Sequence, residues 1–191
     1  MATLPQPVYR TDVFAHQNLK VVTTSGAMQP TDFFSRRERR VAAITLPEQR
    51  RFTIALSIEG ASEPVEFTYT TSDRGLPPWA SAVLQSLSLR WGVRQGWDGY
   101  HAEPTNPQLA VKLLNILSDL MQQDFRPPQV TPLADGGAQA EWHSVGQDLE
   151  IVVRADEEPA YYYFNQTSGM EEEGDIEPKY AHVQDLIGRL S

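Results

Sequence analysis

Two short segments carry the side chains best suited to acid–base or metal chemistry. The first is residues 97–104 (WDGYHAEP), where Asp98 and His101 offer a carboxylate and an imidazole. The second contains Glu141 and His143, which would point to the same face of a strand because side chains alternate along a strand. Carboxylates and imidazoles act as general acids, general bases and metal ligands. A site that combined these four side chains would suit a hydrolase or a nuclease.

Both segments also have a structural explanation, which we favour. Trp97 would fill the core, Asp98 would accept hydrogen bonds from backbone amides of a turn, and Gly99 would supply a positive φ. Glu141 and His143 would form a same-face pair on a solvent-facing strand. The sequence contains no cysteine, no His-Glu-x-x-His and no nucleophile-elbow, phosphate-loop or dinucleotide motif. We therefore expect no catalytic residue, metal or cofactor, and we expect Trp97→Ala to unfold or loosen the protein.

A cluster of arginines between residues 36 and 51 is the candidate for nucleic-acid binding. Guanidinium groups at this density could hold phosphates, or bind an acidic partner in pairs of hydrogen bonds. The alternative is a solvated stretch that pairs with acidic residues of its own chain. The cluster consists of Arg36, Arg37, Arg39, Arg40, Arg50 and Arg51.

The net charge of −9 is distributed unevenly along the chain of 191 residues. Residues 1–100 hold eleven Lys or Arg against nine Asp or Glu, whereas residues 101–191 hold five against sixteen, a balance of −11. An acidic surface disfavours nonspecific binding to nucleic acid or anionic lipid. It favours a basic protein partner, or it serves solubility alone.

A tyrosine-rich segment, residues 161–164 (YYYF), lies between two acidic runs. On a strand, Tyr161 and Tyr163 would point one way, and Tyr162 and Phe164 the other. One face would enter the core, and the other would expose aromatic rings among carboxylates, as at a contact site for a basic partner. We assign Tyr161 and Tyr163 to partner binding. The alternative is a tyrosine-rich sheet with solvated loops. The carboxylates assigned with them are Asp156, Glu157, Glu158, Glu171, Glu172 and Glu173.

The elements that position these residues can be read from hydrophobic periodicity. Period-two alternation predicts strands over residues 52–58 and 65–70, joined by a hairpin loop, and the apolar run 41–46 predicts another strand. A helix is expected from Pro77 to about residue 91.

The second half of the chain reads as a helix, a β-meander and a helix. Thr105 or Asn106 would cap a helix over residues 107–122, where Pro107 occupies the first helical position. Strands are predicted at 129–133, 138–143, 149–154, 160–165 and 170–173, and a final helix after Pro178.

Together these elements predict an α+β fold with antiparallel sheets and about three covering helices. Residues 1–95 would form a β-rich segment that ends in a helix, and residues 96–191 an acidic unit packed against it. We see neither a signal peptide nor a window apolar enough to span a membrane. With no cysteine, these features favour a cytoplasmic protein.

From Gly96 onward, several motifs occur together in a fixed order. They are the loop at 97–104, a Pro-x-x-x-Pro-x-x-Asp-Gly-Gly segment at 128–137, and Glu141-Trp142. Over about residues 91–165 the chain resembles an uncharacterised group of bacterial and phage-borne proteins. His101 stands where a small residue, often Gly, is more usual in that group, which weakens a shared catalytic role. The resemblance implies a setting in toxin neutralisation, phage defence or counter-defence.

The leading hypothesis is a non-catalytic protein that binds a macromolecular partner through its acidic, Tyr-rich C-terminal half. The first alternative is a hydrolase or nuclease that uses Asp98, His101, Glu141 and His143. The second is nucleic-acid binding through the arginines of residues 36–51.

Overall fold

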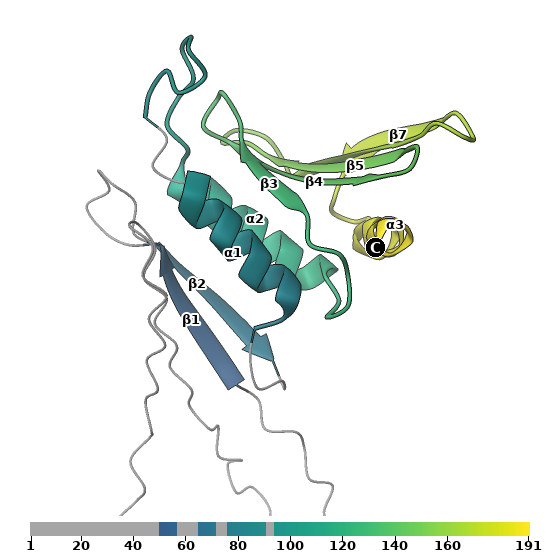
Figure 1. Cartoon of the computed structure of the whole chain (residues 1–191), viewed down its shortest axis with the longest axis horizontal. Helices are drawn as coiled ribbons and strands as arrows, with labels where there is room; N and C mark the ends of the chain where they lie inside the picture. Colours follow the sequence, from purple (N-terminus) through teal and green to yellow (C-terminus); the bar gives the residue numbers. More distant parts are fainter. Residues whose placement is uncertain (1–49, 57–64, 72–75, 91–93) are drawn as a thin grey trace, which may run out of the picture.

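The computed structural model describes residues 50–56, 65–71, 76–90 and 94–191, arranged as Figure 1 shows. The first elements form a β-hairpin, in which β1 (Arg50–Leu56) pairs antiparallel with β2 (Val65–Thr71). The hairpin predicted from alternating apolar residues is thereby confirmed. The strand predicted at residues 41–46 lies outside the described residues.

Two helices follow, and each begins at a proline. They are α1 (Pro78–Arg90) and α2 (Pro107–Leu120). Proline suits the first turn, because the first N–H groups of a helix have no partner within it. Of the two candidates, Asn106 is the N-cap of α2, since its side chain accepts a hydrogen bond of 2.9 Å from the Gln108 N–H. Both predicted helices are confirmed.

Five antiparallel strands then form a meander whose order in space follows the chain. Because each strand pairs with the next through a short connection, the turns set the register of the whole sheet. A final helix, α3 (Tyr180–Leu190), follows the last strand. The strands are β3 (Gln129–Pro132), β4 (Ala138–Ser144), β5 (Gln147–Val153), β6 (Ala160–Asn165) and β7 (Met170–Asp175).

Helices α1 and α2 lie between the hairpin and the five-stranded sheet, and α3 lies beside α2 under the same sheet (Figure 1). Helix α2 contacts β2 on one side and β4 and β5 on the other, while α1 contacts β3 and α3 contacts β4 and β5. The wide apolar stripe of α2 is buried, including Leu109, Leu113 and Leu117. A single hydrophobic core therefore runs from Phe67 in β2 to Leu190 in α3. The protein is α+β, and its described strands form two antiparallel sheets.

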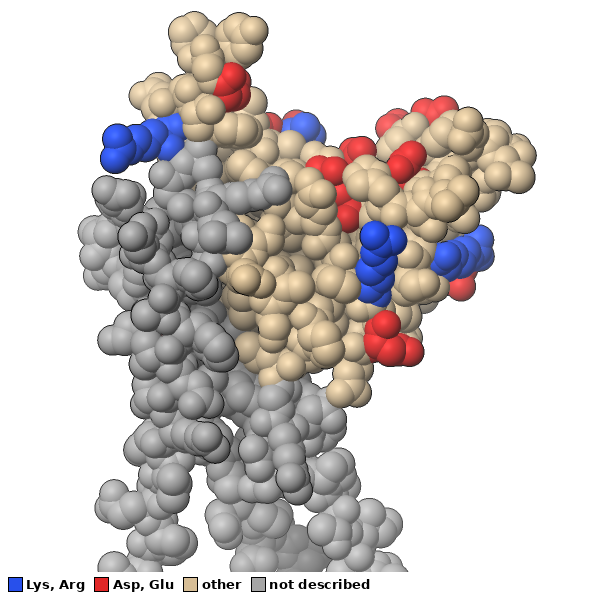
Figure 2. All heavy atoms as spheres, in the orientation of Figure 1, with Lys and Arg blue, Asp and Glu red and all other residues tan. Residues whose placement is uncertain are grey.

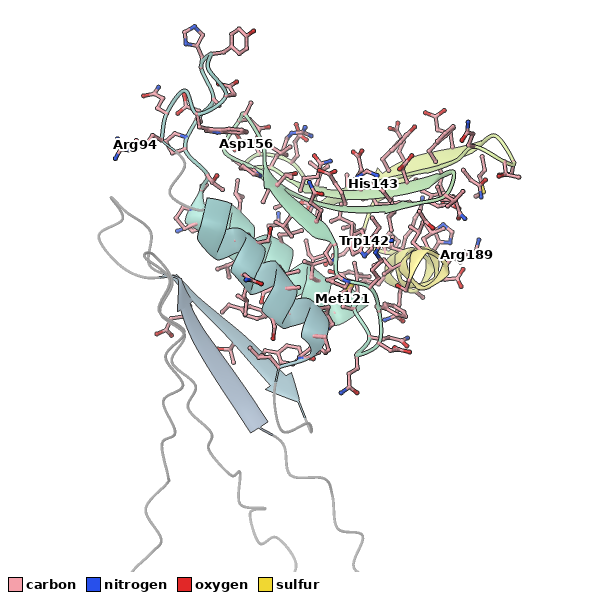
Figure 3. The ribbon with its side chains drawn as sticks, in the orientation of Figure 1. Arg94, Met121, Trp142, His143, Asp156 and Arg189 are labelled. Atoms are coloured by element: carbon pink, nitrogen blue, oxygen red, sulfur yellow. The ribbon has the colours of Figure 1, made fainter. Side chains whose placement is uncertain are left out.

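The five-stranded sheet has an inner face against the helices and an outer face that the described residues leave uncovered. Figure 1 shows α1, α2 and α3 on one side of this sheet. Along β4, Trp142 points to the helices and is buried, whereas His143 points away and is exposed (Figure 3). The outer face consists of Gln129, Thr131, Gln139, Glu141, His143, Asp148, Glu150, Val152, Ala160, Tyr162, Phe164, Glu171, Glu173 and Asp175.

None of the helices in the described part of the chain is both long enough and apolar enough to cross a bilayer.

Candidate functional site

The tyrosine strand β6 divides its rings between the two faces of the sheet. Tyr161 and Tyr163 lie on the inner face and are 2% and 1% exposed. The Tyr163 hydroxyl donates a hydrogen bond of 2.8 Å to Oε1 of Gln147. The rings of Tyr161 and Tyr163 therefore belong to the core and do not lie on the exposed face that the partner-binding prediction requires. Tyr162 and Phe164 are the aromatic side chains that β6 presents on the outer face.

Carboxylates surround these two outward rings. Tyr162 stands in register between Glu150 of β5 and Glu173 of β7, and Phe164 stands between Asp148 and Glu171. Figure 2 shows Asp and Glu gathered along the upper margin of the molecule, over the sheet. No strand residue of the outer face is Lys or Arg. The outer face carries six carboxylates, from Glu141, Asp148, Glu150, Glu171, Glu173 and Asp175.

The surroundings of Tyr162 favour its neutral phenol. Its hydroxyl donates a hydrogen bond of 3.1 Å to Oε1 of Glu171. Desolvation on the sheet, this hydrogen bond and the charges of Glu171, Glu150 and Asp148 all raise the pKa of Tyr162, because each disfavours a phenolate. A neutral phenol held among carboxylates can pack against an incoming cation or donate a hydrogen bond.

His143 lies between two carboxylates at the end of β4. Its Nδ1 is 2.7 Å from Oδ1 of Asp148, and its Nε2 is 3.0 Å from Oε2 of Glu141. The hydrogen bond with Asp148 and then that with Glu141 raise the pKa of His143, because both favour the imidazolium. The same-face placement of Glu141 and His143 is confirmed.

Sequence reasoning missed Asp148 as a partner of His143. The connection between β4 and β5 is only Val145-Gly146, where Gly146 takes the positive φ that a tight hairpin turn requires. A two-residue turn places Ser144 opposite Gln147, and His143 opposite Asp148. The Val-Gly pair is the sequence signal for this turn, whereas the strands predicted at 138–143 and 149–154 leave a longer loop between them.

The loop at 97–104 lies apart from the cluster formed by His143, Glu141 and Asp148. The backbone N–H groups of Glu103 and Asn106 donate to the carbonyl oxygens of Ala134 and Gly136, each at 2.8 Å, so the loop is anchored to the turn before β4. His143 lies near the far end of β4, roughly 17 Å beyond its first residue at about 3.3 Å per residue. The loop rises away from that turn (Figure 1). Thus Asp98 and His101 do not join Glu141 and His143 in one site.

Both nitrogens of the exposed His143 imidazole are engaged by carboxylates, which makes the cluster an ion-pair network rather than a nucleophile–base arrangement. Within the described residues, no group of three His, Cys, Asp or Glu side chains is arranged to hold a metal ion.

The loop at 97–104 is closed by its own hydrogen bonds. One oxygen of Asp98 accepts from the N–H groups of Tyr100 at 2.8 Å and Ala102 at 3.2 Å, and Gly99 has a φ of 84°. The predicted roles of Asp98 and Gly99 are confirmed. Trp97, however, is 40% exposed and Tyr100 is 82% exposed. The prediction that Trp97 fills the core is wrong, because the tight turn holds the ring at the surface.

The six carboxylates predicted to bind a partner divide among three environments. Glu171 and Glu173 belong to the outer face, whereas Glu172 points inward, with its Oε1 at 2.6 Å from Nε2 of His182 in α3. The other three occupy the exposed turn between β5 and β6, at one end of the sheet, where Figure 3 labels Asp156. In that turn Glu157 forms an ion pair of 3.4 Å with Arg154. The turn residues are Asp156, Glu157 and Glu158.

The predicted nucleic-acid site stays a prediction. Arg36, Arg37, Arg39 and Arg40 lie outside the described residues. Arg50 and Arg51 begin β1, and only their backbone is described.

Comparison with protein-family models, with curated proteins and with solved structures finds no match to this chain. The resemblance of residues 91–165 to a bacterial and phage-borne group therefore stays a prediction.

Proposed function

We propose that this protein binds a basic protein partner through the outer face of its five-stranded sheet. The observation that supports the proposal is a sheet face with six carboxylates, no Lys or Arg, and two aromatic rings set among the acids. The toxin or phage setting expected from the resemblance remains part of the proposal.

The chemistry of the outer face favours a cationic protein over a nucleic acid or an anionic membrane. Carboxylates repel phosphate groups, so a phosphate-bearing partner would meet unfavourable potential around Tyr162 and Phe164, where the acids of β5 and β7 flank β6. Lys and Arg side chains can pair with Glu171 and Glu173 and pack over the ring of Tyr162. Partner recognition would combine charge pairing with the burial of Tyr162 and Phe164.

The proposal can be tested by affinity purification from cells of the source organism, followed by direct titration of each captured protein against the full chain. Glu171→Lys combined with Glu173→Lys should weaken a true partner about tenfold, because two surface ion pairs of ~0.7 kcal/mol each are replaced by repulsion. Raising the salt concentration should also weaken the binding of the partner to the unmodified protein, because salt screens the ion pairs.

A matched control is the double variant Asp119→Lys and Asp124→Lys. It reverses the same number of charges at exposed positions, at the end of α2 and in the loop after it. A partner that uses the outer face should bind this control as it binds the unmodified protein. Equal weakening by both double variants would contradict the proposal, since only net charge would then matter.

A further inference from the structure

The two edges of the five-stranded sheet differ in how open they are. At one edge, β3 is four residues long, ends in Pro132, which has no N–H to donate, and contacts α1. At the other edge, β7 has six residues and pairs only with β6 among the described strands. A strand that is paired on one side presents N–H and C=O groups that another chain can bind.

Hydrogen bonds near β7 show which of its backbone groups point away from the sheet. The Ile176 N–H donates to the Pro159 carbonyl oxygen at 2.9 Å, so Ile176 faces β6. Antiparallel strands alternate the direction of their hydrogen-bonding groups from residue to residue. The backbone groups of Glu171, Glu173 and Asp175 therefore point outward at the free edge.

The same three residues also place their side chains on the outer face. All three side chains are exposed, and they recur at every second position, about 7 Å apart along the strand. A strand that docked here would continue the pleat and would also place every second side chain on the outer face. Those side chains would stand directly opposite the three carboxylates, about 5 Å away.

The free edge also adds binding groups that the outer face alone does not offer. An extended segment at the edge would enlarge the contact and would use backbone groups that a globular partner leaves unused. A second copy of this chain is disfavoured, because its Glu171 and Glu173 would oppose like charges.

We propose that β7 accepts an extended segment of a protein partner as a sixth, antiparallel strand, with Lys or Arg at every second position opposite Glu171, Glu173 and Asp175. This inference rests on the proposed function and names the form in which the basic partner binds. In antiparallel addition, the basic residues would be the ones whose N–H groups donate to the edge carbonyl oxygens.

Three synthetic peptides of alternating Lys and Thr, each with a fluorescent label, test this geometry against the unmodified full chain. The first peptide carries no methyl group on its backbone nitrogens. The second is methylated on the backbone nitrogens of its Lys residues, and the third on the backbone nitrogens of the same number of Thr residues. A fourth peptide has the same composition with all Lys in one block. The measurement is fluorescence anisotropy at low salt, with amide NMR shifts of Glu171, Glu173 and Asp175.

Methylation at Lys should weaken binding at least about tenfold, because it removes the donors that face β7, while methylation at Thr should change it less than about threefold. The block peptide should also bind at least about tenfold more weakly, because it cannot match charges at every second position. The inference is overturned if both methylated peptides bind alike, if the block peptide binds as well as the alternating one, or if no peptide binds. None of these results contradicts the proposed function. That function is tested separately, by the binding of a native partner to the Glu171→Lys and Glu173→Lys variant.

Discussion

The two faces of the five-stranded sheet are built from the same strands yet have opposite chemistry. Tyr161 and Tyr163 of β6 are buried with Trp142 and Leu149 against the helices. Tyr162, between them in sequence, lies among carboxylates on a face that the described residues leave open. Residue type did not assign these tyrosines to core or surface. The helices did, because they cover one side of the sheet.

The largest expected difference between the faces is in the free energy of unfolding that two neighbouring tyrosines contribute. Tyr163→Ala should lower the free energy of unfolding by about 3–5 kcal/mol, because it removes a buried ring and leaves a cavity. Tyr162→Ala should lower it by about 1 kcal/mol or less, because the ring is only partly covered. Urea denaturation of both variants measures the two values. Similar losses would mean that the outer face is covered.

The loop at 97–104 allows a second comparison of this kind, between a side chain that holds structure and a ring that only projects from it. Asp98→Ala should cost about 1–2 kcal/mol, because two backbone N–H groups lose their acceptor. Trp97→Ala should cost less than about 1 kcal/mol, since 40% of the residue is exposed. Thermal unfolding of the two variants measures which substitution costs more stability. A larger loss for Trp97→Ala would show that the Trp97 ring contributes to the core.

Adjacent carboxylates of β7 provide a smaller contrast between the faces. Glu172→Ala should lower the free energy of unfolding by about 1 kcal/mol, because Glu172 pairs with His182 on the inner side. Glu173→Ala should change it by less than about 0.5 kcal/mol, because Glu173 is exposed among like charges. If partner binding follows the outer face, Glu173→Ala should weaken it and Glu172→Ala should not. Chemical denaturation and partner titration on the same two variants test both statements.

The smallest expected effect is the pH dependence contributed by His143. Its folded-state pKa is raised by Asp148 and then Glu141, so the imidazolium is favoured in the fold. The stabilisation is therefore complete below the unfolded pKa of about 6.5 and is lost as pH rises through the higher folded value. It should amount to less than about 1 kcal/mol, because the ring is exposed.

The unfolding free energy of the unmodified protein and of His143→Gln, measured between about pH 5 and pH 9, tests this prediction. The difference between the two should shrink as pH rises. The Arg126 guanidinium, which donates to the His143 carbonyl oxygen at 3.2 Å, should keep its contact throughout. A difference that grows with pH would reverse the assigned sign.

Much of the fold could be predicted because the elements are strongly periodic or clearly bounded. The stripe of α2 and the proline and Asn106 at its start are local signals, and the alternation in β4 and β5 is equally direct. The candidate site was harder to predict from the sequence. The face of β6 that enters the core was not decided by periodicity, because its two faces carry similar rings. The pairing of His143 with Asp148 depended on a register that the turn length sets.

The α+β class, the element order and the acidic character of residues 101–191 follow from the sequence, because each of these is a local or summed property. The outward direction of Glu171 and Glu173, the contact of Glu172 with His182 and the exposure of Trp97 depend on the tertiary packing. The physical reason is that the strand backbone is alike on both sides, so the elements that pack against a strand decide which set of alternating side chains is buried. Here the helices α2 and α3 cover the inner side, and among the described residues nothing covers the carboxylate-rich face or pairs with the outer edge of β7.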